Sequence, residues 1–343
     1  MAQHGHGPDP SKIMQIGTGF FATKTLLSAV ELGLFTRLAA SGKTGAAIQK
    51  ELELHPRATA DFLDALVSLG FLKREGASVT GVYTNAEDSD LFLDKNKPTY
   101  MGGILEMANH RLYGFWGHLT EALRTGAPQN EAKQGGDLFQ ALYADERRLE
   151  EFLRAMSGVQ MGAFLTLAQK FDFSPYKTVC DVGGAGGALS MALARAHAHL
   201  SLTSFDLPPV APIATRNVQA AGLAERVAIA AGDFFAGPLP KADVVVMGNI
   251  LHDWNEEKKQ KLVQAAWDAL PPGGAFIAVE NVIDDDRKLN AFGLLMSLNM
   301  LIETGDGFDY TGADFARWTK AAGFKRISVV PLVGPTSAAI AYK

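Results

Sequence analysis

Hydrophobic residues recur at helical spacing through the first half of the chain. Apolar side chains repeat every three or four positions over residues 26–38, and further helices are predicted over 46–52 and 59–69. Alternation of apolar and polar residues over 71–84 then predicts a β-hairpin. Three helices followed by a hairpin outline a winged-helix-like domain, after which helices are predicted over about 101–170.

The pattern changes after Pro175, where short apolar segments alternate with amphipathic ones. This alternation is typical of a parallel sheet whose strands are buried on both faces. The predicted strands are 178–182, 200–205, 227–231, 244–247 and 276–279, with helices at 188–196, 209–221, 256–269 and 311–322 and a final antiparallel pair at 327–331 and 338–342. We therefore expect an α/β protein in which a mostly helical, winged-helix-like domain precedes a doubly wound Rossmann-like domain. The predicted divisions are residues 1–100, 101–174 and 175–343.

Composition narrows the class of protein. Of the 343 residues, 47% are hydrophobic and 20% are charged, a globular mixture that excludes a disordered chain or a coiled coil. The net charge of −5 disfavours a broad cationic surface for nucleic acid or acidic lipid. The single cysteine, Cys180, excludes a disulfide framework and fits a reducing compartment. Without a secretion signal or a membrane-spanning run, we expect a cytoplasmic protein.

A glycine-rich turn follows the first predicted strand of the second domain. Residues 183–187 read Gly-Gly-Ala-Gly-Gly between a strand and a helix, where backbone amides can approach a ligand closely. Asp206 ends the next strand, where a carboxylate can bind a ribose diol. Such turns also occur only to pack a helix against a sheet, but the strand context and Asp206 favour a nucleoside-bearing cofactor.

An acidic residue beside this turn distinguishes between nucleoside cofactors. Asp181 would repel a pyrophosphate and attract an amino group. A dinucleotide pattern started at Gly184 also places Leu189 where a small residue is needed. The turn therefore favours an amino-acid-bearing nucleoside over NAD.

A further motif follows the third predicted strand of this domain. Asp233 could accept a hydrogen bond from the amine of an adenine, and Phe234 could stack on the adenine ring. An ordinary turn capped by Asp has the same sequence pattern.

Four motifs together resemble one enzyme family. DVGGAGG at 181–187, FDLP at 205–208, GDFF at 232–235 and LHDW at 251–254 resemble S-adenosylmethionine-dependent O-methyltransferases of the caffeate/hydroxyindole type. The resemblance covers nearly the whole chain and implies that the winged-helix-like start is a dimerisation domain, so the protein partner is a second copy. It implies S-adenosylmethionine as methyl donor, S-adenosylhomocysteine as product, no metal, and a small hydroxylated aromatic or polyketide-like metabolite as acceptor.

The same resemblance assigns residues to the cofactor. Plant members of the family usually carry lysine where this chain has Gly248, so one cofactor contact is expected to be missing. The cofactor-binding residues that it implies are Asp181, Gly183, Gly184, Gly186, Asp206, Leu207, Gly232, Asp233, Phe234 and Asn249.

The resemblance makes His252 the general base. A phenol has a pKa near ~10, so little phenolate exists at neutral pH, and a histidine can remove the proton as the oxygen attacks. Glu280 and Asp309 would orient the imidazole, while Asp253 is expected to be a cap or a hydrogen-bond partner within its loop. Taken alone, His252 could equally be a strand-end residue that caps the following helix.

The acceptor is implied to lie between the segment 152–161 and the helix 291–302. Thioether side chains adapt to flat aromatic rings, although methionines at helical spacing are also ordinary core residues. The residues expected to contact the acceptor are Met156, Met296, Asn299 and Met300.

Three other functions stay open at this point. A relative could bind S-adenosylmethionine yet catalyse hydroxylation or decarboxylation, and the glycine turn could belong to an NAD-dependent oxidoreductase. The winged-helix outline could belong to a transcriptional regulator, but residues 11–100 hold ten basic and ten acidic side chains, without the basic excess of a DNA reader. Methylation of nitrogen or carbon also stays open, though a histidine base favours oxygen.

Overall fold

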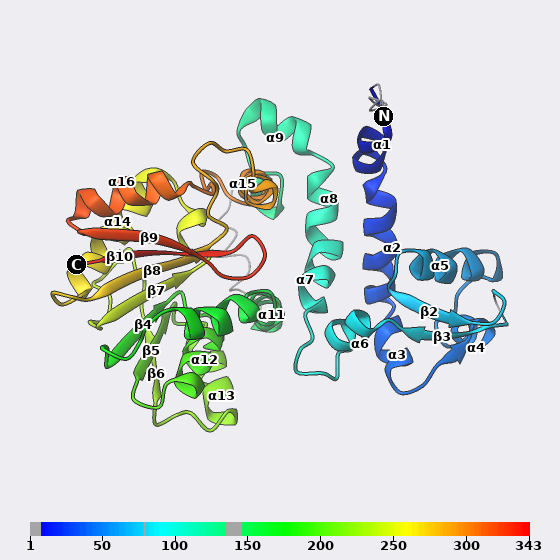
Figure 1. Cartoon of the computed structure of the whole chain (residues 1–343), viewed down its shortest axis with the longest axis horizontal. Coiled ribbons are helices and arrows are strands. Elements are labelled where there is room, and N and C mark those ends of the chain that lie inside the picture. The colour runs from blue at the N-terminus through cyan, green and yellow to red at the C-terminus, as the bar shows by residue number, and fades with distance from the viewer. Residues whose placement is uncertain (1–7, 79, 135–145) are drawn as a thin grey trace, which may run out of the picture. The chain divides into compact units, whose positions relative to one another are not determined.

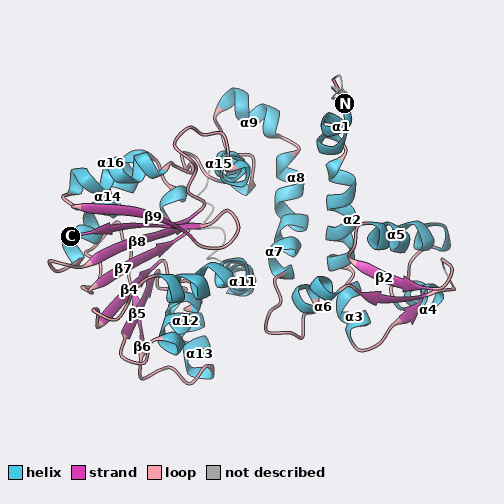
Figure 2. Cartoon of the chain, in the orientation of Figure 1, coloured by secondary structure: helices cyan, strands magenta, loops and turns pink. Residues whose placement is uncertain are grey.

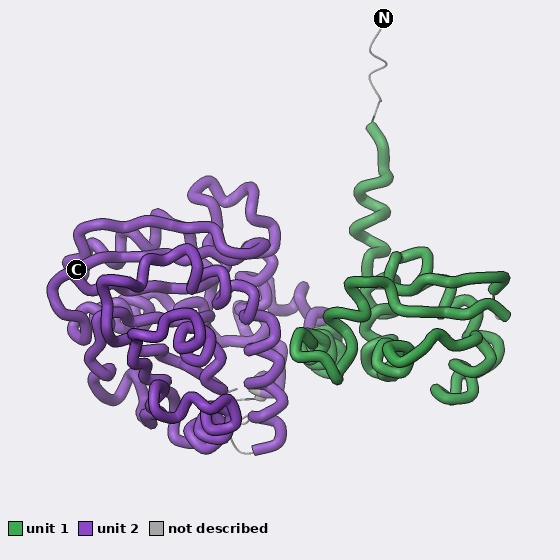
Figure 3. The backbone as a smooth tube through the Cα atoms, turned by 60° about the horizontal axis from the view of Figure 1, so that its bottom comes forward, with its two compact units in different colours: residues 1–113 green, residues 114–343 purple. Residues whose placement is uncertain are grey.

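The structure, a computed structural model, describes residues 8–78, 80–134 and 146–343. It divides into two compact units, Met1–Tyr113 and Gly114–Lys343 (Figure 3). The three-part division made from the sequence stays a prediction. No helix within the described ranges combines the length and the apolar character needed to cross a membrane.

The first unit is mostly helical and carries a small antiparallel sheet (Figure 1). Its helices are α1 (Ser11–Gly17), α2 (Gly19–Glu31), α3 (Leu34–Ala39), α4 (Gly45–Glu51), α5 (Pro56–Ser68), α6 (Glu87–Leu93), α7 (Gly102–Met107) and η1 (Ala108–Leu112). Its strands β1 (Lys43–Thr44), β2 (Leu72–Glu75) and β3 (Val82–Asn85) lie in the order β1-β3-β2. The predicted mostly helical domain with its hairpin is thereby confirmed.

Local chemistry explains where these helices begin and how the hairpin is held. The Thr44 side chain accepts a hydrogen bond from the backbone N–H of Ala47 at the start of α4, and Pro56 occupies the first turn of α5. On β3, the buried Tyr83 hydroxyl donates to the carboxylate of Asp64 over 2.7 Å. Because Asp64 belongs to α5, this bond fixes the hairpin to that helix.

The second unit is built on a seven-stranded sheet in the order β6-β5-β4-β7-β8-β10-β9. The strands are β4 (Thr178–Val182), β5 (Ser201–Asp206), β6 (Val227–Ala231), β7 (Val244–Gly248), β8 (Ala275–Glu280), β9 (Arg326–Pro331) and β10 (Ser337–Tyr342). The helices are α9 (Leu119–Thr125), η2 (Glu131–Gln134), α11 (Glu146–Lys170), α12 (Ala188–Ala196), α13 (Ala211–Ala220), η3 (Leu251–Asp253), α14 (Glu256–Ala269), α15 (Ala291–Glu303) and α16 (Gly312–Ala322), and α8 (Tyr113–Trp116) spans the division between the units.

Helices cover both faces of this sheet (Figures 1 and 2). On β7, Val244 and Val246 belong to the core formed with α11 and α12, whereas Val245 and Met247 belong to the core formed with α14 and α16. Successive side chains of a strand point to opposite faces, so a strand covered on both sides needs an unbroken apolar run. The five strands from β6 to β8 are parallel, and β10 is antiparallel to both neighbours. The predicted doubly wound domain is confirmed.

The strand order reverses between β4 and β7. The chain runs from β4 through β5 to β6 at one edge, then returns to β7 on the other side of β4. Open α/β sheets bind ligands at the carboxyl ends of their strands, in the crevice at this reversal. The glycine turn after β4, Asp206 at the end of β5 and His252 in the turn after β7 all lie at this edge.

Candidate active site

The glycine turn after β4 is drawn tightly against its neighbours. The backbone amides of Gly183 and Gly184 both donate to the carbonyl of Phe205, over 2.8 and 3.2 Å. A Cβ at Gly183 would lie 2.2 Å from Ile250 Cδ1, and one at Gly184 would lie 2.2 Å from Ser204 Oγ. Gly183 also has φ of 70°. Only glycine permits both this close approach and this backbone conformation.

Asp206 holds the same turn from β5. Its Oδ2 accepts a hydrogen bond from the Ala185 amide over 2.8 Å, and its Oδ1 accepts one from the Leu207 amide over 2.7 Å. Burial raises the pKa of Asp206, although the two hydrogen bonds from backbone amides act to lower it. Each carboxylate oxygen keeps a second lone pair, so Asp206 can also accept from a ligand hydroxyl.

Asp181 lines the cleft from the end of β4. It is 3% exposed, and its Oδ2 accepts from the amide and the hydroxyl of Ser190, over 3.2 and 2.9 Å, at the start of α12. Burial raises the pKa of Asp181 to about 7. A cationic amino group at this cleft would favour the ionised carboxylate.

Helix α11 forms the wall of the cleft opposite the glycine turn. The residues that line the cleft are Met156, Ser157, Gln160 and Phe164 of α11, Asp181, Gly183, Gly184, Ala185, Ala188 and Leu189 around the turn, and Gly248. A Cβ at Gly248 would lie 3.0 Å from Gln160 Oε1 and 3.3 Å from the ring of Phe164. Gln160 was missed from the sequence, although its spacing of four from both Met156 and Phe164 places all three on one helix face.

The segment expected to bind adenine lies after β6. Gly232 is packed against Phe205, because a Cβ there would lie 2.6 Å from the ring. Asp233 caps its own turn, since its Oδ1 accepts from the Phe235 amide over 2.7 Å. The ring of Phe234 lies edge-on to Trp254, with 6.1 Å between ring centroids. The sequence pattern is compatible with this cap and with an adenine contact. The structure contains the cap, and contact with adenine stays a prediction.

Asn249 and Gly186 complete the set of residues expected at the cofactor. Asn249 has φ of 53° and its amide donates to Val279 O over 3.1 Å, so the chain turns sharply after β7. Gly186 lies on the other side of the glycine turn, and its carbonyl accepts from Asn217 Nδ2 over 3.1 Å. Contact of these two residues with the cofactor stays a prediction.

His252 lies buried in the 3-10 turn η3, with 6% of its surface exposed. Its Nδ1 lies 3.5 Å from Asp309 Oδ1, and its Nε2 lies 3.5 Å from Asp253 Oδ1. Burial disfavours the charged imidazolium, but the carboxylates of Asp253, Asp309 and Glu280 outweigh it and raise the pKa of His252 to about 10. The sequence predicts Asp253 as a cap or a hydrogen-bond partner within its loop, whereas its carboxylate lies beside the imidazole.

Glu280 acts on the turn that carries His252. Its Oε1 accepts hydrogen bonds from the backbone amides of Ile250, Leu251 and His252, over 3.0, 2.7 and 3.3 Å. A side chain that binds three successive amides fixes the conformation of the turn and therefore the direction of the imidazole. Spacing alone could not reveal this link, because Glu280 lies on the next strand.

The residues expected at the acceptor lie in different surroundings. Met156 lines the cleft, whereas Asn299 and Met300 are buried in α15 and Met296 is half-buried. The Asn299 side chain accepts a hydrogen bond from Trp116 Nε1 over 2.9 Å. Contact of these residues with an acceptor stays a prediction.

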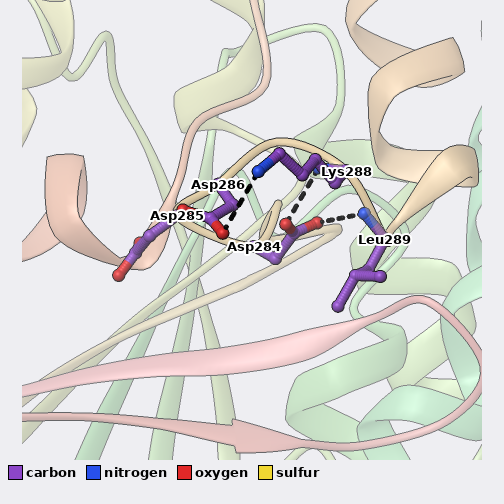
Figure 4. Close-up of a pocket in the computed structure, with 5 residues that line it drawn as sticks. All are labelled: Asp284, Asp285, Asp286, Lys288 and Leu289. Atoms are coloured by element: carbon purple, nitrogen blue, oxygen red, sulfur yellow. Dashed lines mark hydrogen bonds and ion pairs between the residues drawn. The ribbon is translucent and has the colours of Figure 1, made fainter.

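A second hollow lies over the loop after β8 (Figure 4). Asp284 accepts from the amides of Lys288, Leu289 and Asn290, over 2.9, 2.8 and 3.0 Å, and these bonds lower its pKa to about 2. The carboxylate thus closes its own loop, and we assign no ligand to it. Within the described ranges, no three His, Cys, Asp or Glu side chains are grouped as a metal site.

Comparison with known proteins decides which family has this site. Residues 116–325 match the family described as the O-methyltransferase domain, and residues 14–95 match the O-methyltransferase dimerisation domain. The chain belongs to the O-methyltransferase family. As a member it is an S-adenosylmethionine-dependent O-methyltransferase, which confirms the predicted cofactor and sets aside the NAD-dependent oxidoreductase and the transcriptional regulator.

Two curated relatives of this O-methyltransferase come from Streptomyces. The tetracenomycin polyketide synthesis 8-O-methyl transferase TcmO of Streptomyces glaucescens is 41% identical, over 100% of this chain and 99% of its own length. The N,N-dimethyltransferase OxyT of Streptomyces rimosus is 34% identical, over 91% of this chain and 90% of its own length.

Two solved structures resemble the O-methyltransferase described here. Human N-acetylserotonin methyltransferase in complex with SAM has a TM-score of 0.90 and 30% identity, covering 99% of each chain. NcsB1 from neocarzinostatin biosynthesis, in complex with SAM and 2-hydroxy-5-methyl naphthoic acid, has a TM-score of 0.74 and 27% identity, covering 93% of this chain and 95% of its own.

Proposed function

We propose that this O-methyltransferase methylates a phenolic hydroxyl of a small aromatic, polyketide-like metabolite, with His252 as the general base. The observation that carries the proposal is a buried imidazole between Asp309 and Asp253, in a turn whose Ile250 touches the glycine turn. The name of TcmO and the naphthoic acid in the NcsB1 structure support an aromatic acceptor.

The cleft residues would hold S-adenosylmethionine, which supplies an electrophilic methyl group on a sulfonium. The glycine turn at Gly183 and Gly184 would contact its amino acid part, and Asp181 would pair with its amino group. Asp206 would accept from the ribose hydroxyls. Phe234 would stack on the adenine, and Asp233 would accept from its amine. The close approach of the turn to β5, and the polar groups on both sides of it, support this assignment.

The imidazole would take the acceptor's proton at Nε2. Asp309 and Asp253 lie 3.5 Å from Nδ1 and Nε2, and a proton held on Nδ1 by Asp309 would leave Nε2 able to accept beside Asp253. The imidazolium that forms lies between two carboxylates, which stabilise its charge. Because the pKa of His252 is raised to about 10 and that of a phenol is near ~10, transfer of the proton is close to balanced. At neutral pH most of the imidazole is protonated, so it must first lose that proton before it can act as the base.

We expect kcat to rise with pH above 7. The base works only when neutral, and with a pKa raised to about 10 the neutral fraction of His252 grows about tenfold for each pH unit below that value. The measurement is kcat between pH 6.5 and 9.5 at saturating methyl donor and acceptor. An ascending limb centred near 6.5, the value of an ordinary histidine, would contradict the raised pKa.

Replacing Asp206 with alanine should weaken cofactor binding. The variant loses the ribose contact and both amide bonds that shape the turn, and bonds to a charged group are worth roughly 1.5–3 kcal/mol. We expect the Kd of S-adenosylhomocysteine, measured by calorimetry, to rise about tenfold or more. Asp243→Ala is a matched control, because Asp243 accepts from the amides of Lys177 and Thr178 at the opposite end of β4. Equal weakening in both variants would contradict a direct role for Asp206.

We infer that the chain forms a homodimer through residues 14–95. The match of this segment to a dimerisation domain supports a second copy as the partner. In the same unit, α1 and α2 leave Ile13, Ile16 and Phe21 exposed to solvent. Clustered apolar side chains of this size are commonly covered by a partner.

A further inference from the structure

Ser190 holds the carboxylate of Asp181 at the cofactor cleft, and none of the preceding roles uses it. Ser190 lies in the first turn of α12 and is 0% exposed. Its hydroxyl and its backbone amide both donate to Oδ2 of Asp181, over 2.9 and 3.2 Å. Oδ1 accepts no hydrogen bond from any residue that the structure describes, and Asp181 lines the cleft. One oxygen of the carboxylate is therefore committed, and the other is available to a ligand.

Helix α12 begins without the usual side-chain cap. Its N-cap residue is Gly187, which has no side chain to accept from the amides of the first turn. The carboxylate of Asp181 takes this place from β4, and a negative charge is favourable at a helix N-terminus. Capping needs only the amide of Ser190. The hydroxyl adds a second donor to the same oxygen, which restricts rotation of the carboxylate.

The carboxylate of Asp181 is costly to ionise at this position. Burial raises its pKa to about 7 against the two bonds from Ser190, which act to lower it, and the like charge of Asp206 adds to the rise. Near neutral pH the ionised fraction is therefore about one half. Loss of a donor to this carboxylate shifts it toward the neutral acid.

Within the described residues, the other elements around Asp181 place no further charged side chain beside it. Ser204 on β5 and Val246 on β7 are its partners in register. On β4 itself, burial raises the pKa of the Cys180 thiol to about 12, so this neighbour stays neutral. Helix α11 lines the cleft with Met156, Ser157, Gln160 and Phe164. The two donors of Ser190 are thus the groups that favour the ionised form.

We propose that Ser190 is a positioning residue for cofactor binding, whose hydroxyl and amide occupy one oxygen of Asp181 and leave the other as an ionised acceptor for the amino group of S-adenosylmethionine. The inference rests on the proposed function, because it assumes that Asp181 pairs with this amino group. Ser190 is fully buried, so it acts through Asp181 and not by touching the cofactor.

The test measures the Kd of S-adenosylhomocysteine by calorimetry between pH 5.5 and 8.5, in Ser190→Ala and in the unchanged enzyme. Loss of the hydroxyl should raise the pKa of Asp181 by on the order of one pH unit, because hydrogen bonds to a charged group are among the stronger ones. Binding to the variant should then be weaker by about tenfold at pH 5.5 and by about fivefold at pH 7, and about equal at pH 8.5. A merely structural role would weaken binding by the same factor at every pH. That result, or no weakening at all, would overturn the proposal.

Three further variants keep the test decisive. Asp181→Asn has no carboxylate charge, so adding Ser190→Ala to it should weaken binding no further. Thr319→Val removes another buried hydroxyl, which donates only to carbonyls of its own helix α16, and should leave the Kd unchanged at every pH. If Ser190→Ala does not fold, Ser190→Cys supplies a weaker donor and should act in the same direction by a smaller factor.

The outcomes separate the role of Ser190 from that of Asp181. If Ser190→Ala weakens binding equally with and without the carboxylate of Asp181, the role of Ser190 is overturned. If Asp181→Asn binds as tightly as the unchanged enzyme at every pH, the pairing of Asp181 with the amino group is overturned, and the role of Ser190 with it.

Discussion

Replacing His252 with alanine should lower kcat by about 10²–10⁴-fold, the usual contribution of a general base. The variant keeps the glycine turn and Asp206, so the Kd of S-adenosylhomocysteine should not change. Transfer of a labelled methyl group to a phenolic acceptor measures the first quantity, and calorimetry measures the second. The imidazole is buried with its nitrogens 3.5 Å from two carboxylates, and the alanine variant leaves both carboxylates without this partner.

His199→Ala is the matched control for this variant. His199 lies before β5, at the opposite end of the sheet, where its Nε2 lies 3.1 Å from the carbonyl of Phe173. Its loss should leave kcat unchanged. Nearly intact activity in His252→Ala would show that the base has been assigned wrongly.

Replacing Gly183 with alanine should weaken cofactor binding severely, with a rise of about 100-fold or more in the Kd of S-adenosylhomocysteine. The new Cβ would lie 2.2 Å from Ile250 Cδ1, so either the turn or the segment leading to His252 must move. A geometric error of this size at a binding turn is expected to cost far more than the strain of the backbone alone. Calorimetry on the folded variant measures the effect.

Gly222→Ala separates the clash from the strain. Gly222 has φ of 68°, close to the 70° of Gly183, but a Cβ there would meet nothing within 4 Å. Both variants carry a left-handed non-glycine residue, at a cost of roughly 1–2 kcal/mol in folding. Only Gly183→Ala should lose the cofactor. Equal loss of binding in both would mean that general destabilisation, and not the shape of the turn, is responsible.

The fold could be predicted from the sequence because its strands are buried on both faces. Segments such as 244–247 contain only apolar residues because both faces of the strand are buried. Their alternation with amphipathic segments therefore predicts the order of strands and helices. The glycine turn was also predictable, because Gly183 has a left-handed backbone and a Cβ at Gly184 would lie 2.2 Å from Ser204 Oγ.

The surroundings of His252 were harder to predict, because they depend on contacts between distant segments. Glu280 was expected beside the imidazole, but its Oε1 binds the backbone of the turn, which no spacing rule reveals. Asp253 and Lys259 follow His252 in sequence as ordinary polar residues of a helix start. The burial of Lys259, and the position of Asp253 Oδ1 3.5 Å from His252 Nε2, appear only in the folded chain.

The central claim is methyl transfer to a phenolic oxygen, and the product itself tests it most directly. The purified enzyme would be incubated with methyl-labelled S-adenosylmethionine and hydroxylated naphthoic acids, and the position of the label determined by mass spectrometry and NMR. We expect one methyl group on the hydroxyl oxygen and one equivalent of S-adenosylhomocysteine. A label on carbon or nitrogen, or no transfer to any phenol by protein that binds S-adenosylhomocysteine, would contradict the account.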